Sequence, residues 1–253
     1  MGMKRKLLFA GASLLVLGVC APASAADLAV APIYSKAPAM VSAIYDWSGL
    51  YLGLNGGGGW TRVRNANPDV YDDFSGNGGT FGGQIGYRWQ LSNWVFGVEG
   101  QGNWADFSAD VTKNWPGSTE TGTVHVNSFG LFTGQIGYAW NNVLLYVKGG
   151  GAVVSNKIDS KEVALDGSTL YTASGSLTKW GGTVGVGLDY GFAPNWSLGL
   201  EWNHVFVAGQ NFSENYVDAG GSYTADARVG RQNIDMGLVR LNYRFGGPAV
   251  ARY

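Results

Sequence analysis

Apolar and polar residues alternate along much of this chain, and the alternation limits the folds that it can adopt. In the first such stretch Leu50, Leu52 and Leu54 share one parity, whereas Gly53 and Asn55 share the other. A two-residue period is typical of β-strands whose two faces meet different surroundings. Eight strands are expected in all, around residues 47–60, 80–89, 94–103, 132–140, 143–154, 181–190, 196–203 and 231–245.

The connections between these stretches alternate in length. Tight turns are expected at residues 90–93, 141–142 and 192–195, and long polar loops at residues 62–79, 106–123, 156–176 and 209–230. This alternation is typical of an outer-membrane barrel with its longer loops outside the cell. We therefore predict an all-β fold, an eight-stranded antiparallel transmembrane β-barrel with short periplasmic turns and long extracellular loops.

Two short motifs repeat along the chain. The sequence GQIGYRW at residues 83–89 returns as GQIGYAW at residues 134–140, and NWxxGxE at residues 93–99 returns at residues 195–201. Repeats of such units also occur in propellers and solenoids. Four hairpins fit a single closed barrel better.

Composition agrees with a wall that faces lipid. Charged residues are 14% of the chain, whereas soluble domains have about a quarter. Glycine is abundant at 41 residues, and the chain has 10 Trp and 13 Tyr. No apolar run after the N-terminal region is long enough for a spanning helix, so a membrane location requires paired strands closed into a barrel.

The N-terminus has the pattern of an export signal. A basic segment precedes a short apolar run, and Ala23, Ser24 and Ala25 form an A-x-A cleavage site. A retained anchor helix is the less favoured alternative, and Cys20 is expected to leave with the signal. The expected organisation is a cleaved signal peptide at 1–25, a periplasmic leader at 26–46, the barrel at 47–245 and an extension at 246–253.

One parity of the strands carries the polar residues that should point into the barrel. Eight strands enclose an interior that side chains just fill. Since the set contains both signs of charge, we predict a salt-bridged polar core. Its members are Gln84, Arg88, Glu99, Gln101, Lys148, Asp189, Glu201, Asn203, Arg240 and Arg244. Asp235 is irregular, because it falls on the apolar parity, and a β-bulge is one explanation.

Tryptophans cluster near the expected strand ends. Trp and Tyr favour membrane–water interfaces, where an apolar ring meets lipid and its polar edge meets water. We expect a periplasmic girdle beside the tight turns and an outer girdle at the far ends. The residues are Trp47, Trp89, Trp94, Trp140 and Trp196 for the first, and Trp60 and Trp104 for the second.

Four consecutive glycines, at residues 56–59, interrupt the first strand. They do not form a phosphate-binding loop, because the G-x-G-x-x-G spacing and a following helix are both absent. They do not read as a linker, because Trp60 continues the parity of Leu54. We expect them to curve the wall and leave space for larger side chains, so that a bulky residue at Gly57 should impair assembly.

Three segments carry a family resemblance: SKAP at residues 35–38, YDWSGLYLGLNGGGGW at 45–60 and VRLNYRF at 239–245. They resemble the small outer-membrane β-barrel surface antigens of alphaproteobacteria, porin-family or opacity-type proteins related to the OmpA-like membrane domain. The resemblance implies a cell outer-membrane location and an assembly signal at Tyr243 and Phe245. Arg240 departs from that signal, which usually has glycine there, and eight residues follow Phe245.

The same resemblance implies a structural and surface role, in envelope integrity and surface interactions. A small porin for passive diffusion of ions or solutes is the alternative, and the charged interior favours the first role. Expected partners are outer-membrane lipid, lipopolysaccharide and the barrel-assembly machinery.

Catalysis, cofactors and nucleic acid are not indicated. The chain has two histidines, His125 near Ser128 and His204 on an apolar parity, and no Walker motif, H-E-x-x-H or cysteine pair. No basic patch suggests nucleic acid. Acidic residues of the expected loops could instead attract divalent cations or host surface molecules: Asp69, Asp72, Asp73, Asp106, Asp110, Glu120, Asp159, Glu162, Asp166, Glu214, Asp218 and Asp226.

Overall fold

The computed structural model describes residues 45–64 and 74–246. The expected signal peptide, most of the leader and most of the C-terminal extension lie outside the described residues. The described residues form ten strands: β1 (Gly49–Val63), β2 (Phe74–Leu91), β3 (Trp94–Trp115), β4 (Ser118–Trp140), β5 (Val143–Ala164), β6 (Thr169–Ala193), β7 (Trp196–Val207), β8 (Gln210–Asp218), β9 (Gly221–Val229) and β10 (Gln232–Phe245).

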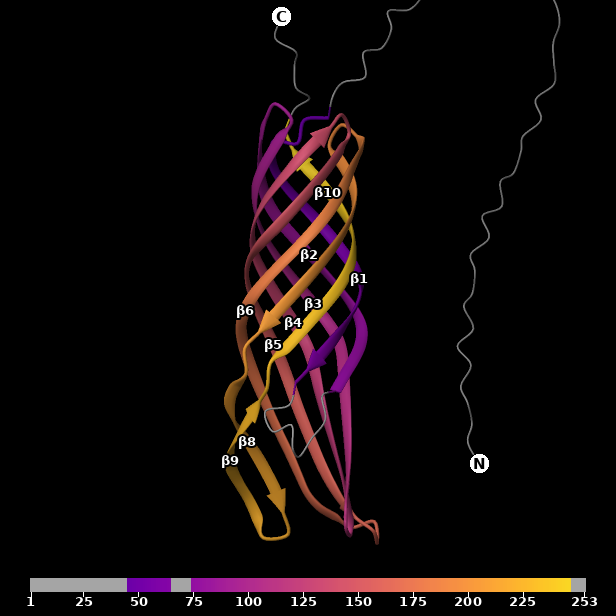
Figure 1. Ribbon diagram of the computed structural model, residues 1–253, viewed down its shortest axis with the longest axis vertical. Coiled ribbons are helices and arrows are strands. Elements are labelled where there is room, and N and C mark those ends of the chain that lie inside the picture. Colours follow the sequence, from indigo (N-terminus) through magenta and orange to yellow (C-terminus); the bar gives the residue numbers. More distant parts are fainter. Residues whose placement is uncertain (1–44, 65–73, 247–253) are drawn as a thin grey trace, which may run out of the picture. The chain divides into compact units, whose positions relative to one another are not determined.

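Eight of these strands close into a barrel (Figure 1). The order is β5-β4-β3-β2-β1-β10-β7-β6, and pairing of β5 with β6 completes the ring. Every neighbouring pair is antiparallel. The closed ring leaves no edge strand in the wall, which a span of hydrocarbon requires. The expected eight-stranded antiparallel barrel is therefore confirmed.

The long connections are more ordered than expected. The segments at 106–123 and 156–176 are not irregular loops, because β3 and β4 stay paired as far as Trp115 and Ser118, and β5 continues to Ala164. In the fourth connection β8 and β9 form a separate hairpin, and β8 pairs with the start of β6. Outside a membrane both faces of a hairpin meet water, so apolar and polar residues no longer alternate there. The backbone hydrogen bonds between the strands nevertheless continue.

The short turns share one asparagine contact. The second turn residues, Asn93, Asn142 and Asn195, donate through Nδ2 to a backbone carbonyl of the next hairpin, over 2.9, 3.0 and 2.7 Å. Their own carbonyls accept from the same neighbours' backbone over 2.7–2.8 Å. Each turn is thereby fastened to the adjacent hairpin.

Asn142→Ala should lower the free energy of unfolding by about 1 kcal/mol, the usual contribution of one hydrogen bond. The reason is loss of the Nδ2 bond to the Gly191 carbonyl. Urea unfolding in lipid vesicles measures it, and Asn114→Ala, at an exposed contact in the β3–β4 hairpin, is the matched control. Equal midpoints for the two variants would contradict the role of the turn asparagine.

The outer wall is apolar and aromatic. Most large hydrophobic side chains on the outward parity are more than a third exposed, for example Leu54 at 58%, Phe81 at 56% and Leu200 at 61%. Aromatic rings touch one another beside the short turns, with Trp94 next to Tyr138 and Trp196 next to Tyr243 at centroid distances of 5.4 and 5.0 Å. No described helix has the length and hydropathy to cross a membrane.

Glycine on the inner parity gives space to bulky neighbours. A Cβ at Gly86 would overlap the Tyr51 ring, and one at Gly187 would overlap the Tyr146 ring. A Cβ at Gly57 would fall on the backbone carbonyl of Gly237 in β10. These positions allow close approach of strands and large side chains inside a narrow barrel.

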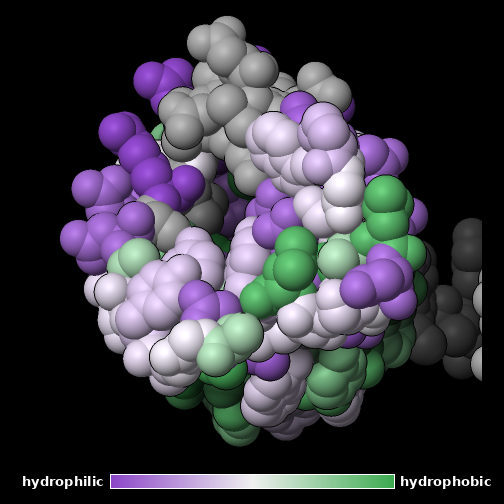
Figure 2. All heavy atoms as spheres, turned by 90° about the horizontal axis from the view of Figure 1, so that it is seen from below, coloured by the Kyte–Doolittle hydropathy of each residue, from purple (hydrophilic) through white to green (hydrophobic). Residues whose placement is uncertain are grey.

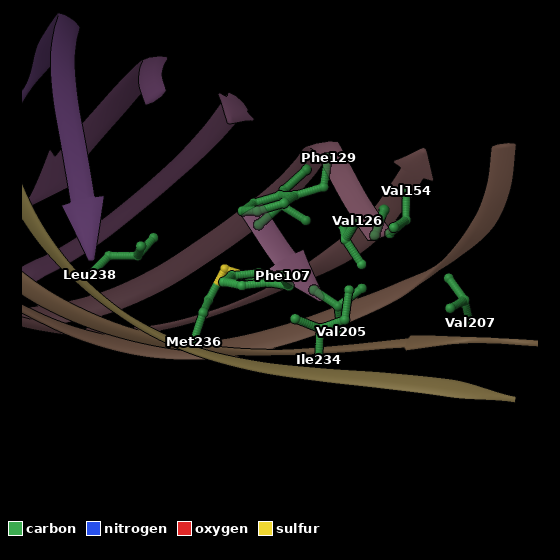
Figure 3. Packing of buried hydrophobic residues seen from close by; sticks show 11 residues of the cluster. Phe107, Val126, Phe129, Val154, Val205, Val207, Ile234, Met236 and Leu238 are labelled. Carbon is green, nitrogen blue, oxygen red and sulfur yellow. The ribbon is translucent and has the colours of Figure 1, made fainter. Parts of the chain in front are cut away.

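The barrel interior contains an apolar layer that the sequence reading did not foresee. Side chains from β3 and β4 point across the lumen toward those of β7 and β10 (Figure 3). The layer lies farther along the strands from the short turns than the charged residues do. Its members are Phe107, Val126, Phe129, Leu131, Ala152, Val154, Val205, Val207, Ile234, Met236 and Leu238.

This layer explains the irregular start of β10. Ile234, Met236 and Leu238 point inward, which leaves Asp235 on the outside. The pairing of β10 with β1 and β7 runs without a register shift, so the β-bulge explanation is wrong. At this level the apolar residues of β10 are on the inward parity, because the lumen is apolar here.

Candidate functional site

The repeated NWxxGxE motif places two carboxylates in the barrel interior. Glu99 on β3 and Glu201 on β7 each lie five residues past a tight-turn tryptophan, on the inward parity. Each accepts a hydrogen bond of 2.6 Å from a tyrosine hydroxyl, Glu99 from Tyr51 and Glu201 from Tyr146. The repeat therefore builds two similar Tyr–Glu pairs on different sides of the lumen.

Two cations join the pairs. Arg240 of β10 donates through Nη1 to Glu201 and through Nη2 to Glu99, and both ion pairs are buried. Lys148 of β5 bridges the same carboxylates, with Nζ 3.0 Å from Glu99 Oε1 and 2.6 Å from Glu201 Oε1. Because both cations contact both carboxylates, the four charges form one network rather than separate pairs.

A third ion pair lies beside this network. Arg88 contacts Asp189 over 2.9 Å, and its guanidinium lies over the Tyr51 and Tyr146 rings at 4.6 and 5.3 Å. With Arg88 and Asp189 this level of the interior holds three cations and three carboxylates, and each cation is paired with at least one carboxylate. Pairing of opposite charges is the condition under which burial of ions is tolerated.

All ten residues expected in the interior are at most 6% exposed. The amides extend the charged network, since Asn203 donates to Glu201 over 2.8 Å and Gln84 donates to Asn242 over 2.7 Å. Arg244 differs from the rest. It lies at the short-turn end and donates to the backbone carbonyls of Ser48 and Pro194 over 3.1 and 3.2 Å.

The placement of Trp47 in the aromatic girdle is wrong. Its side chain is 2% exposed and packs inside the barrel against Tyr45, with centroids 4.4 Å apart. Its backbone N–H donates to Gln90 over 2.8 Å, which fixes the entering chain at the first turn. Trp47 shares the parity of Tyr51, and this shared parity predicts that the Trp47 side chain points into the barrel. Tyr45 and Trp47 thus occupy the short-turn end of the lumen.

The other six expected girdle residues are exposed on the wall, at 40–73%: Trp60, Trp89, Trp94, Trp104, Trp140 and Trp196. Trp180, at 72%, also lies on the outside. Tyr243 and Phe245 are on the outer wall of the last strand, with rings 5.0 Å apart. Arg240, which departs from the assembly pattern, is one of the two cations that contact both glutamates, together with Lys148.

Sequence reasoning missed the residues that connect the charges. Tyr51, Tyr146 and Gln135 are buried, and Gln135 joins Arg88 to the Tyr51 hydroxyl over 3.3 and 2.9 Å. Tyrosine and glutamine occur at lipid interfaces, in lumens and in loops, so residue type alone does not predict whether these side chains point inward. Parity did carry the signal, since Tyr51 lies opposite the three leucines of β1.

The two histidines do not form a catalytic arrangement among the described residues. No hydrogen bond in that part of the chain joins His125 to Ser128, and a register shift separates Val126 from Ser128. His204 contacts Asp235 over 2.8 Å on the outer wall, between Trp202 and Phe206. A nucleophile positioned by this pair is not found among the described residues.

The outer hairpins use their acidic residues to hold themselves together. Glu162 accepts from Ser118, and Asp166 accepts from Ser168, which keeps the pKa of the Asp166 carboxyl below its usual value. Within the described ranges no group of three or more His, Cys, Asp or Glu residues is arranged to hold a metal ion. Asp69, Asp72 and Asp73 lie outside those ranges. The end with the hairpin tips is mostly hydrophilic or neutral (Figure 2).

The β8–β9 hairpin should dock more firmly as pH falls. Burial raises the pKa of Glu214, which accepts from Tyr216 over 3.0 Å and has Glu120 and Asp159 nearby. The folded state therefore holds this proton more tightly than the unfolded chain. Stability from the group is present below its ordinary pKa and is lost as pH rises through the raised value.

Hydrogen exchange of β8 and β9, corrected for intrinsic rates, should show stronger protection at pH 5 than at pH 7.5. Glu214→Gln should remove the difference and protect at both pH values. A wild-type pH dependence that persists in this variant would point to other groups.

A closed barrel with an apolar outside and charged inside is a transmembrane barrel of the outer-membrane type. The model of the family called outer membrane protein beta-barrel domain matches residues 12–245. The chain belongs to this family and is located in the cell outer membrane.

The chain is similar to known surface proteins over most of its length. It is 30% identical over 235 residues to the 31 kDa outer-membrane immunogenic protein of Brucella melitensis, covering 88% of this chain and 93% of the relative. It is 25% identical to the 25 kDa outer-membrane immunogenic protein of Brucella canis, covering 95% and 98%. A major outer membrane protein from Thermus thermophilus has a TM-score of 0.48 at 14% identity, covering 78% of this chain and 99% of that one.

Proposed function

We propose that this protein is a non-catalytic wall component of the outer membrane, which contributes to envelope integrity and presents surface hairpins. The observation that carries the proposal is the buried network of Arg240, Lys148, Glu99 and Glu201. These side chains meet from β3, β5, β7 and β10 across the interior. Conduction would have to part buried ion pairs, which is costly in a low-dielectric site.

The layers on either side of the network support the same proposal. Tyr45 and Trp47 lie toward the short turns, and the apolar layer that includes Phe107 and Met236 lies toward the hairpins. At the hairpin edge of that layer, next to Val207, Gln232 donates to Thr61 and Asn156 over 3.1 and 3.3 Å. A solute would cross aromatic, ionic and apolar layers in turn.

The outer wall fits the proposed contact with lipid. The aromatic residues beside the short turns would lie at the periplasmic interface, and Trp60, Trp104 and Trp180 at the outer one. Tyr243 and Phe245, exposed at the end of β10, are available to the barrel-assembly machinery.

The hairpins that extend beyond the wall are the proposed surface of interaction. Leu165 at 83% exposure, Val217 at 51% and Tyr223 at 51% present apolar groups near their turns. The names of the relatives say that those proteins are immunogenic. We propose that antibodies or host surface molecules meet this chain at the same hairpins.

Single-channel recording in planar bilayers tests the proposed closed lumen. The refolded protein should give no stable conductance steps at moderate voltage, because the layers close the interior. Heat-dependent migration on a gel should first show that the inserted protein is folded. Reproducible open steps from folded protein would reject the closed lumen and favour the small porin.

A further inference from the structure

A hollow of about 390 Å³ lies on the outer wall where β1, β7 and β10 reach the hairpin end. Beyond this point the chain leaves β7 at Val207 and β8 pairs with β6 instead, so these neighbouring strands end at a similar level. The residues around the hollow are Arg62, Arg64, Phe206, Val207, Ala208, Arg231 and Asn233.

The register brings three arginines to this hollow. Arg62 pairs with Asn233, which pairs with Phe206, and the backbone N–H of Arg64 donates to the Arg231 carbonyl over 2.8 Å. Arg62 and Arg64 continue the outward parity of Trp60, and all three arginines are exposed. The cations therefore lie on the outside of the wall, away from the ionic core.

The wall below the arginines is aromatic. Trp60, Trp202 and Phe206 are 51%, 41% and 47% exposed. The acidic residue described at this level, Asp235, is paired with His204. The surface thus changes within a few residues from an apolar wall to a group of guanidinium cations, as expected at the outer boundary of the hydrocarbon.

Chemistry of this kind selects an anion attached to a lipid. Guanidinium groups bind phosphate through paired, charge-assisted hydrogen bonds. Arg62 and Arg231 bring two positive charges to one hollow, and an anion relieves their mutual repulsion. The outer leaflet of an outer membrane supplies such a molecule, because the lipid A part of lipopolysaccharide carries phosphates directly above its acyl chains.

We propose that this hollow binds a phosphate of lipid A, with the acyl chains along Trp60, Trp202 and Phe206. The inference rests on the outer-membrane location and the geometry of β1, β7 and β10. It does not depend on a closed lumen, so conductance and lipid binding can fail separately.

Native mass spectrometry of the full mature protein in detergent, titrated with bis-phosphorylated lipid A, tests the proposal. Arg62→Gln with Arg231→Gln should weaken binding about tenfold or more, since each basic residue near an anionic membrane surface contributes about 1 kcal/mol. Lys157→Gln with Lys161→Gln is the matched control, because it removes two exposed cations from the β5 hairpin and leaves the hollow intact. The control should bind like the wild type.

Two comparisons with the wild-type protein need no variant. Dephosphorylated lipid A should bind about tenfold more weakly, and inorganic phosphate alone should not displace phosphorylated lipid A. Equal binding of both lipid A forms would overturn the proposal, as would equal weakening by the two double variants. Equal affinity for phosphatidylglycerol vesicles would overturn the assignment to lipid A.

Discussion

Arg240→Met should lower the free energy of unfolding by about 3–5 kcal/mol, the range for removing one partner of a buried ion pair. Arg240 contacts both Glu99 and Glu201 and also donates to the Tyr146 hydroxyl over 3.0 Å. Without it, two buried carboxylates share Lys148 as their remaining cation in the four-residue network. The free energy of unfolding falls by more than the loss of one contact would cause, because an excess negative charge stays in the interior.

Urea unfolding in lipid vesicles, followed by tryptophan fluorescence and gel migration, measures this effect. A compensated variant separates charge imbalance from lost packing: Glu99→Gln, Glu201→Gln, Lys148→Met and Arg240→Met together remove two charges of each sign. It should be more stable than Arg240→Met alone, since a neutral network leaves no unpaired ion. A single variant with wild-type stability, or a compensated variant less stable than the single one, would contradict the network.

The face of each inward residue could be predicted from the sequence, but its partners could not. The two-residue period places Arg240, Glu99 and Lys148 on the inner parity, whereas their meeting depends on strand tilt and register around the closed ring. Repetition of NWxxGxE marked Glu99 and Glu201 without saying that they share two cations.

The errors have a common physical origin. The alternation predicts that apolar and aromatic residues face lipid. Inside this barrel, however, some levels of the lumen are also filled by apolar and aromatic side chains. Trp47 lies inside against Tyr45, and Asp235 lies outside because Ile234 and Met236 fill the lumen at its level. The outer hairpins were expected as loops because water on both faces removes the alternation that identifies a strand, while the backbone pairing remains.

The glycines of β1 provide the second large effect. Gly57→Leu should prevent most of the protein from folding into the barrel, whereas Gly56→Leu should be tolerated. A Cβ at Gly57 would overlap the backbone of Gly237 and Leu238, which cannot move without breaking the β1–β10 pairing. At Gly56 the nearest atoms are 3.6 Å away on Phe81, an ordinary contact distance.

The two substitutions add the same side chain to adjacent positions of one strand. Their strand propensity is therefore matched, but Gly57 faces the lumen and Gly56 faces lipid, so the difference reports both the space and the surroundings of each position. Overpacking against side chains costs typically 1–3 kcal/mol, and an overlap with backbone in the β1–β10 closure should cost more. The fraction of heat-modifiable protein after refolding, and the amount in outer-membrane fractions, should fall strongly for Gly57→Leu. Equal yields for the two variants would show that β1 can shift to admit the side chain, and that the glycines are not required for closure.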